Sequence, residues 1–268
     1  MKAVSALPIL LISAGLLSGC ATVPYTGRSQ LALMPDSEVM AMSRSSYREM
    51  LSEAKVLTST PEAKAIDRVG RRIAAAAEEF LRAEGLANRA GDFEWEFALI
   101  DDDETVNAWA MPGGKIAVYT GILPLTEDDA GLAVVMGHEV AHALANHGRE
   151  RLSQLLLFQL GYTGLDLALQ QEPDTSRDLW LTAFGLGAQV GLLLPYSRTQ
   201  EYEADRIGLI LTARAGYDPR AAVPFWERMT KEGEGEFLEF LSTHPAGAKR
   251  IREIEAMMPE ALRYYHPR

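Results

Sequence analysis

Two amphipathic helices are predicted early in the chain from the spacing of their apolar residues. The first is expected at residues 37–54, where polarity is mixed and an Asp-Ser pair suits a helix start. The second is expected at residues 60–84, because Thr60 is a good capping residue and Pro61 favours the first helical position. Its apolar stripe consists of Ile66, Val69, Ile73 and Ala77.

The periodicity changes at about Asp92 from helical to alternating. Residues 94–100 alternate as a half-buried strand does, and residues 106–110 and 115–119 are predicted as two further strands. Residues 112–114, Pro-Gly-Gly, are expected to form the turn between the last two strands. The pattern therefore predicts a mainly helical α+β chain with a small antiparallel sheet.

An apolar run at residues 131–136 leads into GHEVAHALANH at residues 137–147. His138 and His142 are four residues apart, so on a helix they project from one face and can bind the same metal ion. Glu139 cannot easily reach that metal but can reach a water molecule bound to it, which is the position of a general base. An isolated HExxH also occurs by chance on ordinary helices, so the motif alone leaves a purely structural helix as the alternative.

A catalytic zinc ion takes three protein ligands and leaves a fourth position for water. The best third candidate is in SRTQEYEAD, residues 197–205, where Glu201 and Asp205 share a helix face. Glu201 is predicted to bind zinc, and Asp205 to lie behind it and accept the free N–H of a ligand histidine. This pattern, the apolar approach and the His147-Gly148 pair together favour a catalytic site over a chance match. His147 itself is interpreted as a cap of the active helix.

The stretch between the two motifs, residues 152–195, is rich in leucine. Leu179–Ser197 is 19 residues long without a charge, close to the length of about 20 that spans a bilayer. Glycines interrupt it, and a span there would have to keep both metal motifs on one side of the membrane. A buried helix pair or a membrane-facing hairpin is therefore favoured over a span.

Residues 1–19 are predicted to be a signal peptide, because a lysine and a short apolar region precede Leu-Ser-Gly-Cys20. This ending resembles a bacterial lipoprotein signal, in which Cys20 carries lipid; an ordinary cleavage site is the alternative. Residues 20–35 are expected to tether the domain, residues 36–268, to the membrane. Because Ala21 rather than aspartate follows the cysteine, we expect attachment to the outer membrane, facing the periplasm.

Composition narrows the function classes. The formal net charge of −11 at neutral pH argues against nucleic acid as a partner and provides no polybasic patch for anionic lipids. Anchoring is therefore expected from lipid on Cys20. Cys20 is also the only cysteine, so no disulfide can form within the chain and the domain depends on its core for stability.

Four sequence blocks occur in a fixed order, VNAWAMPGGKIAVYTGIL, HEVAHALANH, SRTQEYEADRIG and STHPAGAKRI. They resemble the signatures of the HtpX/Ste24-type zinc metallopeptidase family. The resemblance runs from about Gln30 to about Met258, and the soluble bacterial lipoprotein branch (LoiP/BepA-like) is the most similar in length and layout. BepA-like members carry a long C-terminal helical-repeat domain, and none is expected in this chain, which ends at Arg268.

The resemblance implies a zincin fold of the gluzincin type and one Zn²⁺ per chain. It implies that His138, His142 and Glu201 are the metal ligands and that Glu139 is the general base. A small antiparallel sheet is expected beside the HExxH helix.

Two further features follow from the resemblance. The strand Asn107, Ala108, Trp109, Ala110 is implied to be the edge along which substrate lies, and a buried hairpin that braces the active helix is the alternative. His244 is implied to lie near the metal, where it either blocks the water position as a fourth ligand or stabilises the oxyanion. A loop histidine packed before proline is the alternative.

These features predict a zinc endopeptidase that hydrolyses unfolded or misassembled envelope proteins. The expected partners are such proteins, the membrane through the lipid on Cys20, and the envelope assembly machinery. One alternative is a chaperone-like outer-membrane assembly lipoprotein with a mostly closed metal site. The other is a structural zinc protein, which leaves Glu139 without a role.

Overall fold

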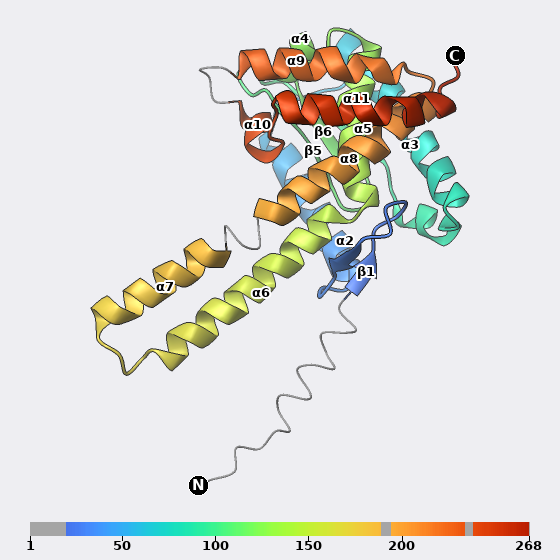
Figure 1. Ribbon diagram of the computed structural model, residues 1–268. Coiled ribbons are helices and arrows are strands. Elements are labelled where there is room, and N and C mark those ends of the chain that lie inside the picture. The colour runs from blue at the N-terminus through green and yellow to red at the C-terminus, as the bar shows by residue number, and fades with distance from the viewer. Residues whose placement is uncertain (1–19, 189–193, 234–237, 268) are drawn as a thin grey trace.

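The computed structural model describes residues 20–188, 194–233 and 238–267 (Figure 1). The predicted signal peptide, residues 1–19, lies outside the described residues. The helices and strands are β1 (Cys20–Thr22), β2 (Ser29–Leu31), α2 (Asp36–Glu53), β3 (Val56–Leu57), α3 (Pro61–Ala83), β4 (Glu96–Ile100), β5 (Ala108–Met111), β6 (Lys115–Tyr119), α4 (Leu123–Thr126), α5 (Asp129–Leu144), α6 (His147–Ala168), α7 (Asp174–Ala188), α8 (Leu194–Arg214), α9 (Ala222–Glu232), α10 (Glu239–Thr243) and α11 (Ala248–Ala261). The predicted mainly helical α+β class is confirmed.

Helix α3 starts where the sequence predicts. The side chain of Thr60 accepts a hydrogen bond from the backbone N–H of Ala63, and Pro61 occupies the first turn, where no N–H is needed. The predicted apolar stripe faces the core, and each member is at most 1% exposed: Ile66, Val69, Ile73 and Ala77. Helix α3 thereby packs against α5 and the sheet.

The main sheet has the strand order β3-β4-β6-β5. β5 and β6 are antiparallel, as expected, and β3, a strand that the sequence did not predict, is antiparallel to β4. β4 and β6 are parallel. β5 lies at the edge of the sheet, and the chain reverses direction at residues 112–114. β6 therefore lies between β5 and β4 and runs in the same direction as β4. Gly113 and Gly114 both have φ of +83°, a conformation that glycine adopts without strain. β5 is therefore an edge strand of the described sheet.

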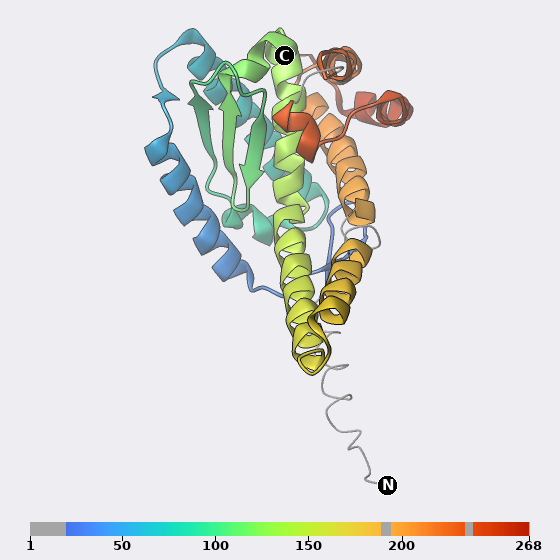
Figure 2. The same cartoon turned by 90° about the vertical axis from the view of Figure 1, so that its left-hand side faces the viewer.

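Helices cover both faces of this sheet (Figure 2). On one face, Tyr47 of α2 packs on Ala98, Ile100 and Ala117 and makes an edge-on ring contact with Trp109. On the other face, the alternate residues of β4 and β6 join the main core with α3 and α5. The sheet thus fixes α5 from one side, and α8 packs along its other side.

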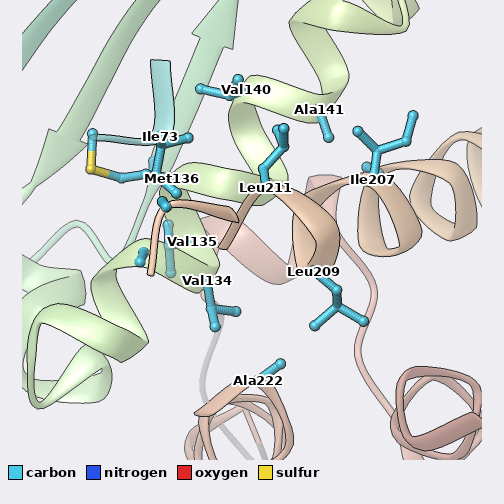
Figure 3. Packing of buried hydrophobic residues seen from close by; sticks show 14 of the residues in the cluster. Ile73, Val134, Val135, Met136, Val140, Ala141, Ile207, Leu209, Leu211 and Ala222 are labelled. Carbon is cyan, nitrogen blue, oxygen red and sulfur yellow. The ribbon is translucent and has the colours of Figure 1, made fainter. Parts of the chain in front are cut away.

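The core between α5 and α8 is apolar (Figure 3). Met136 and Val140 of α5 and Ile207 and Leu211 of α8 are all fully buried. Each such side chain contributes about 1.5–3 kcal/mol through its burial, so this interface is a major source of stability. It also determines how the motifs on the two helices face each other.

Residues 20–35, expected to be a tether, differ from that expectation. β1 and β2 form an antiparallel pair, and Val23 beside them is only 1% exposed. Arg28 makes ion pairs with Glu150 of α6 and Glu203 of α8. The segment is therefore a β-hairpin docked on the two helices, because Arg28 pairs with a buried carboxylate on each of them.

Helices α6 and α7 form an antiparallel hairpin that projects from the body of the molecule (Figure 1). Phe158 and Phe184 stack between them with ring centroids 5.6 Å apart. None of the described helices combines the length and apolar character needed to cross a membrane. Part of Leu179–Ser197 lies outside the described residues. Exposed large apolar side chains on the hairpin are Leu155, Leu156, Leu157, Leu160, Leu167, Leu179 and Trp180.

Candidate active site

The HExxH motif lies on α5, whose N-terminus is capped by Asp128. The side chain of Asp128 accepts hydrogen bonds from the backbone N–H groups of Ala130 and Gly131. His138 and His142 project from one face of the helix, as their spacing predicts, and their Nε2 atoms are 3.1 Å apart. The two Nε2 atoms are therefore close enough to bind the same metal ion.

Glu201 on α8 adds a carboxylate beside these two nitrogen atoms. Its Oε2 lies 3.2 Å from His138 Nε2, and its Oε1 lies 3.3 Å from His142 Nε2. Burial alone would raise the pKa of this carboxyl, but the adjoining histidines, His142 foremost, hold it far below its ordinary value. Glu201 is therefore an anion, as a metal ligand has to be.

Two glycines set the close approach of α5 and α8. A Cβ atom on Gly208 would lie 2.9 Å from the backbone nitrogen of His138, and one on Gly137 would lie 2.8 Å from Thr212 Oγ1. No side chain larger than hydrogen fits at these positions without displacing the opposite helix. The contact brings Glu201, about two turns before Gly208, against the two histidines.

His244 follows α10 and enters the same cluster. Its Nδ1 lies 2.9 Å from Glu201 Oε2 and 3.2 Å from His138 Nε2. Its Nε2 lies 3.4 Å from Glu139 Oε1, and the residue is 5% exposed. The structure thus places His244 beside the other donors, in the position that the resemblance implies.

Glu139 lies next to the donor cluster rather than within it. The residue is 2% exposed, and among the described residues its Oε1 has no hydrogen-bond partner. Burial raises the pKa of Glu139 above its ordinary value, although the charges of His244 and His138 counteract the shift. A carboxyl group with a raised pKa is well suited to accept a proton and return it.

Asp205 lies behind His138, as predicted, with its Oδ1 3.1 Å from His138 Nδ1. Arg250 of α11 donates to both of its oxygens, from Nε to Oδ2 at 2.8 Å and from Nη2 to Oδ1 at 2.7 Å. Burial alone would raise the pKa of Asp205, but the charge of Arg250 outweighs it and lowers that pKa. The guanidinium also lies over the ring of Trp226 at 3.6 Å. Arg250 was not anticipated from the sequence.

His147 is not a cap of α5; it begins α6 and lies in direct contact with a member of the cluster. Its Nδ1 is 2.8 Å from His142 Nδ1, and its Nε2 is 3.1 Å from Glu203 Oε2. Asn146 breaks the helix with φ of +56°, a left-handed conformation that asparagine tolerates. This break turns His147 back toward His142, and helical spacing alone could not have revealed the contact.

A cleft of about 270 Å³ opens beside the donor cluster. Its lining includes residues 107–110 together with Glu139, His142 and His244. Because β5 is an edge strand of the described sheet, an extended peptide paired with it would run past Glu139.

The donor set fits a zinc ion. One atom each from His138, His142, Glu201 and His244 lies within 4.8 Å of the others, and all four residues are buried. Two histidines with one glutamate form a common ligand set of catalytic zinc. Burial would lower the pKa of His138, but Asp205 and Glu201 outweigh it and raise that pKa to about 9. Metal binding at neutral pH therefore has to displace a proton.

Comparison with known proteins agrees with this chemistry. The model of Peptidase family M48 matches residues 64–258. The chain is 40% identical over 230 residues to the mitochondrial metalloendopeptidase OMA1 of Schizosaccharomyces pombe, covering 82% of this chain and 61% of that protein. It is 30% identical over 246 residues to OMA1 of Homo sapiens, covering 90% and 46%.

Bacterial relatives match at lower identity. The chain is 25% identical over 238 residues to the beta-barrel assembly-enhancing protease of Escherichia coli, covering 87% of this chain and 46% of that protein. The chain thus spans only about half to three fifths of the length of these relatives. From the matched region and the identity to OMA1, the chain belongs to peptidase family M48, a family of zinc metallopeptidases.

Proposed function

We propose that the chain is a zinc-dependent endopeptidase that hydrolyses peptide bonds in unfolded or misassembled proteins of the bacterial envelope. The observation that carries the proposal is the position of Glu139. This buried carboxyl, with a raised pKa, lies next to the four-donor cluster and lines the cleft beside β5. A structural metal site would not need such a group.

Bound zinc would supply a Lewis acid that activates water and polarises the substrate carbonyl. Glu139 accepts the proton of the attacking water and delivers it to the leaving amine. Asp205 accepts from His138 Nδ1, so Nε2 of that ring stays free of a proton and faces the metal. β5 orients the peptide through main-chain hydrogen bonds, which depend little on side-chain identity.

Selection for unfolded substrates follows from this mode of recognition. Only an extended, unpaired backbone can add to the edge of a sheet, so a folded protein does not qualify. The name of the Escherichia coli relative, beta-barrel assembly-enhancing protease, also supports a role in the envelope. We further propose that lipid on Cys20 anchors the protein to the outer membrane, facing the periplasm. A Cys20→Ser variant that still sediments with washed membranes would refute this anchor.

Glu139→Gln tests the endopeptidase proposal. We expect normal folding and one zinc ion per chain, but a loss of cleavage of at least about 10³-fold, because the water proton has no acceptor. The substrate is a reduced and alkylated protein, compared with its folded form, and Glu62→Gln serves as the surface control. Loss of zinc from Glu139→Gln, or cleavage at the wild-type rate, would contradict the assignment.

The position of His244 favours a second candidate, an assembly lipoprotein of chaperone type whose metal site is mostly closed. Its Nδ1 lies within 2.9 Å of Glu201, where it competes for the fourth metal position. If blocking dominates, His244→Ala should raise cleavage. If oxyanion stabilisation dominates, it should lower kcat by about 10²-fold with zinc retained. An unchanged rate and zinc affinity would remove His244 from the site.

A further inference from the structure

Arg28, in the loop of the N-terminal hairpin, pairs with a carboxylate on α6 and a carboxylate on α8. Arg28 Nε donates to both oxygens of Glu203, at 3.1 and 3.0 Å. Its Nη1 and Nη2 donate to the two oxygens of Glu150, at 2.7 and 2.8 Å. Glu203 is 2% exposed and Glu150 is fully buried, so both carboxylates depend on protein partners rather than water.

Glu203 is thereby fixed in position as well as in charge. Thr26 Oγ1, from the same hairpin, donates to Glu203 Oε1 at 2.6 Å. The other oxygen, Oε2, lies 3.1 Å from His147 Nε2. The hairpin therefore presents an oriented acceptor to His147.

The direction of the hydrogen bonds follows from the chemistry of the rings. The Nε2 of His142 faces the donor cluster, so for metal binding its proton has to be on Nδ1. That N–H donates to His147 Nδ1 at 2.8 Å, which in turn requires the proton of His147 on Nε2. Nε2–H then donates to the carboxylate of Glu203. Each ring is 7% exposed or less, so solvent offers little alternative to this order.

We propose that Arg28 is a positioning residue for the metal ligand His142, acting through Glu203 and His147. The guanidinium holds the Glu203 carboxylate charged and correctly turned, the carboxylate fixes the tautomer of His147, and His147 fixes that of His142. A correctly placed acceptor raises the basicity of a ligand histidine and strengthens metal binding. The inference rests on the metal site of the proposed function and adds a residue to it.

Arg28 lies outside residues 64–258, which the family model matches. The proposal therefore adds to the metal site a hairpin, carrying Arg28 and Thr26, that lies outside the matched residues. The spacing of the HExxH and ExxxD motifs does not indicate this role of Arg28. The two carboxylates that Arg28 contacts lie more than a hundred residues away along the chain.

Arg28→Met tests the proposal in the full chain. Zinc affinity is measured by competition with a chromophoric chelator, and the ligand field by the visible spectrum of the Co²⁺-substituted protein. We expect zinc to bind about 10-fold more weakly, at the low end of the effect of removing an outer partner of a ligand histidine. We also expect an altered cobalt spectrum and partial recovery in Arg28→Lys.

Arg149→Met is the matched control. Arg149 also holds the N-terminal segment, through the carbonyl of Met34 at 2.7 Å and an ion pair with Asp36, but touches neither Glu203 nor His147. We expect this variant to lose thermal stability while keeping zinc affinity within about two-fold. Equal losses of zinc affinity in Arg28→Met and Arg149→Met would reduce the role of Arg28 to docking, and an unchanged affinity in Arg28→Met would overturn the proposal.

Glu203→Gln covers the case in which Arg28→Met does not fold. It keeps the pair between Arg28 and Glu150 but removes the charge that accepts from His147, so zinc affinity should fall by a similar factor. Wild-type affinity in Glu203→Gln would also refute the proposal. Because the readout is metal binding, absence of peptide cleavage in the wild-type chain would contradict the proposed function and leave this test intact.

Discussion

The two histidines of α5 share one helix face, yet the structure supports them differently. His138 has a carboxylate in direct contact, since Asp205 Oδ1 lies 3.1 Å from its Nδ1. His142 has a neutral ring, His147, in the equivalent place at 2.8 Å. A charged acceptor raises the basicity of a ligand ring more than a neutral one does, so we expect the His138 side to contribute more to metal affinity.

The supports also differ in where they come from. Asp205 and Arg250 lie on α8 and α11, within the matched residues 64–258. The support of His142 ends on Arg28, in the N-terminal hairpin. One side is therefore built from the helices of the family domain, and the other is completed by a separate segment. Substitutions can therefore alter the support of one histidine alone or the contact between α5 and α8 that both share.

Asp205→Asn should have the largest effect. Arg250 would hold the amide oxygen, so the amide N–H would face His138 Nδ1 and move the proton of that ring to Nε2, the metal-binding atom. We expect cleavage to fall by about 10²- to 10⁴-fold, as with other wrong-tautomer variants, together with weaker zinc binding. Peptide cleavage and zinc competition measure it, with the partly exposed Asp129→Asn, which is far from the site in its pairing with Arg68, as control. Wild-type values in Asp205→Asn would show that Asp205 does not orient His138.

Arg250→Met should destabilise the metal-free protein strongly. Arg250 lies 2.7 Å from Asp205 and 3.2 Å from Glu201, so its removal takes a cation from two buried carboxylates and leaves His138 as the cation in contact with both. Breaking a buried pair in this way costs about 3–5 kcal/mol. Urea unfolding with chelator measures the loss, and zinc should restore part of it because the ion neutralises the same charges. Arg206→Met, which breaks a partly exposed pair with Glu260, should cost about 1 kcal/mol or less.

An equal loss in the two arginine variants would argue against a buried charge cluster around Asp205. If zinc did not raise the unfolding free energy of Arg250→Met, that result would also argue against the charge cluster, because the ion would not be replacing the missing cation.

Local spacing explains which parts of the site could be predicted. The start of α3, the bounds of β6 and the placement of His138, Glu139 and His142 on one helix depend on residues within one or two turns of each other. Glu201 and Asp205 follow from the same rule. Helical and strand periods are properties of neighbouring residues, so they can be detected in a single sequence.

Contacts over long sequence separations could not be predicted in this way. Arg250 meets Asp205 across 45 residues, and Arg28 meets Glu203 across 175. Any arginine can pair with any carboxylate, so charge carries no information about which partner is chosen. The docking of residues 20–35 and the parallel pairing of β4 with β6 depend on the same kind of distant contact.

Glu203 should make the His142 side sensitive to acid. Burial would raise its pKa, but hydrogen bonds from His147, Arg28 and Thr26 outweigh this and lower the pKa from 4.5 to about 2. Because the folded state has the lower pKa, its stabilising contribution is complete above about pH 4.5 and is lost as the pH falls toward about 2. The full contribution is on the order of 3 kcal/mol.

Metal-free Glu203→Gln should therefore lose less unfolding free energy than the wild type over this acidic range. Urea unfolding at a series of pH values measures the difference, with the exposed Glu62→Gln as control. Parallel pH profiles for the wild type and Glu203→Gln would contradict the role assigned to this carboxylate.

Gly208→Ala should have the smallest effect and should act on both sides together. The new Cβ would lie 2.9 Å from the backbone nitrogen of His138, so α8 has to move away from α5 and take Glu201 with it. We expect a cost of about 1–3 kcal/mol in unfolding free energy, typical of overpacking, and weaker zinc binding because Glu201 moves from both histidines. Gly164→Ala on α6 is the matched control, since its Cβ would meet nothing within 4 Å and helix propensity favours alanine. If Gly208→Ala were as stable as Gly164→Ala and bound zinc equally well, the close approach of α5 and α8 would not determine the site, and the two supports would have to position their histidines independently of it.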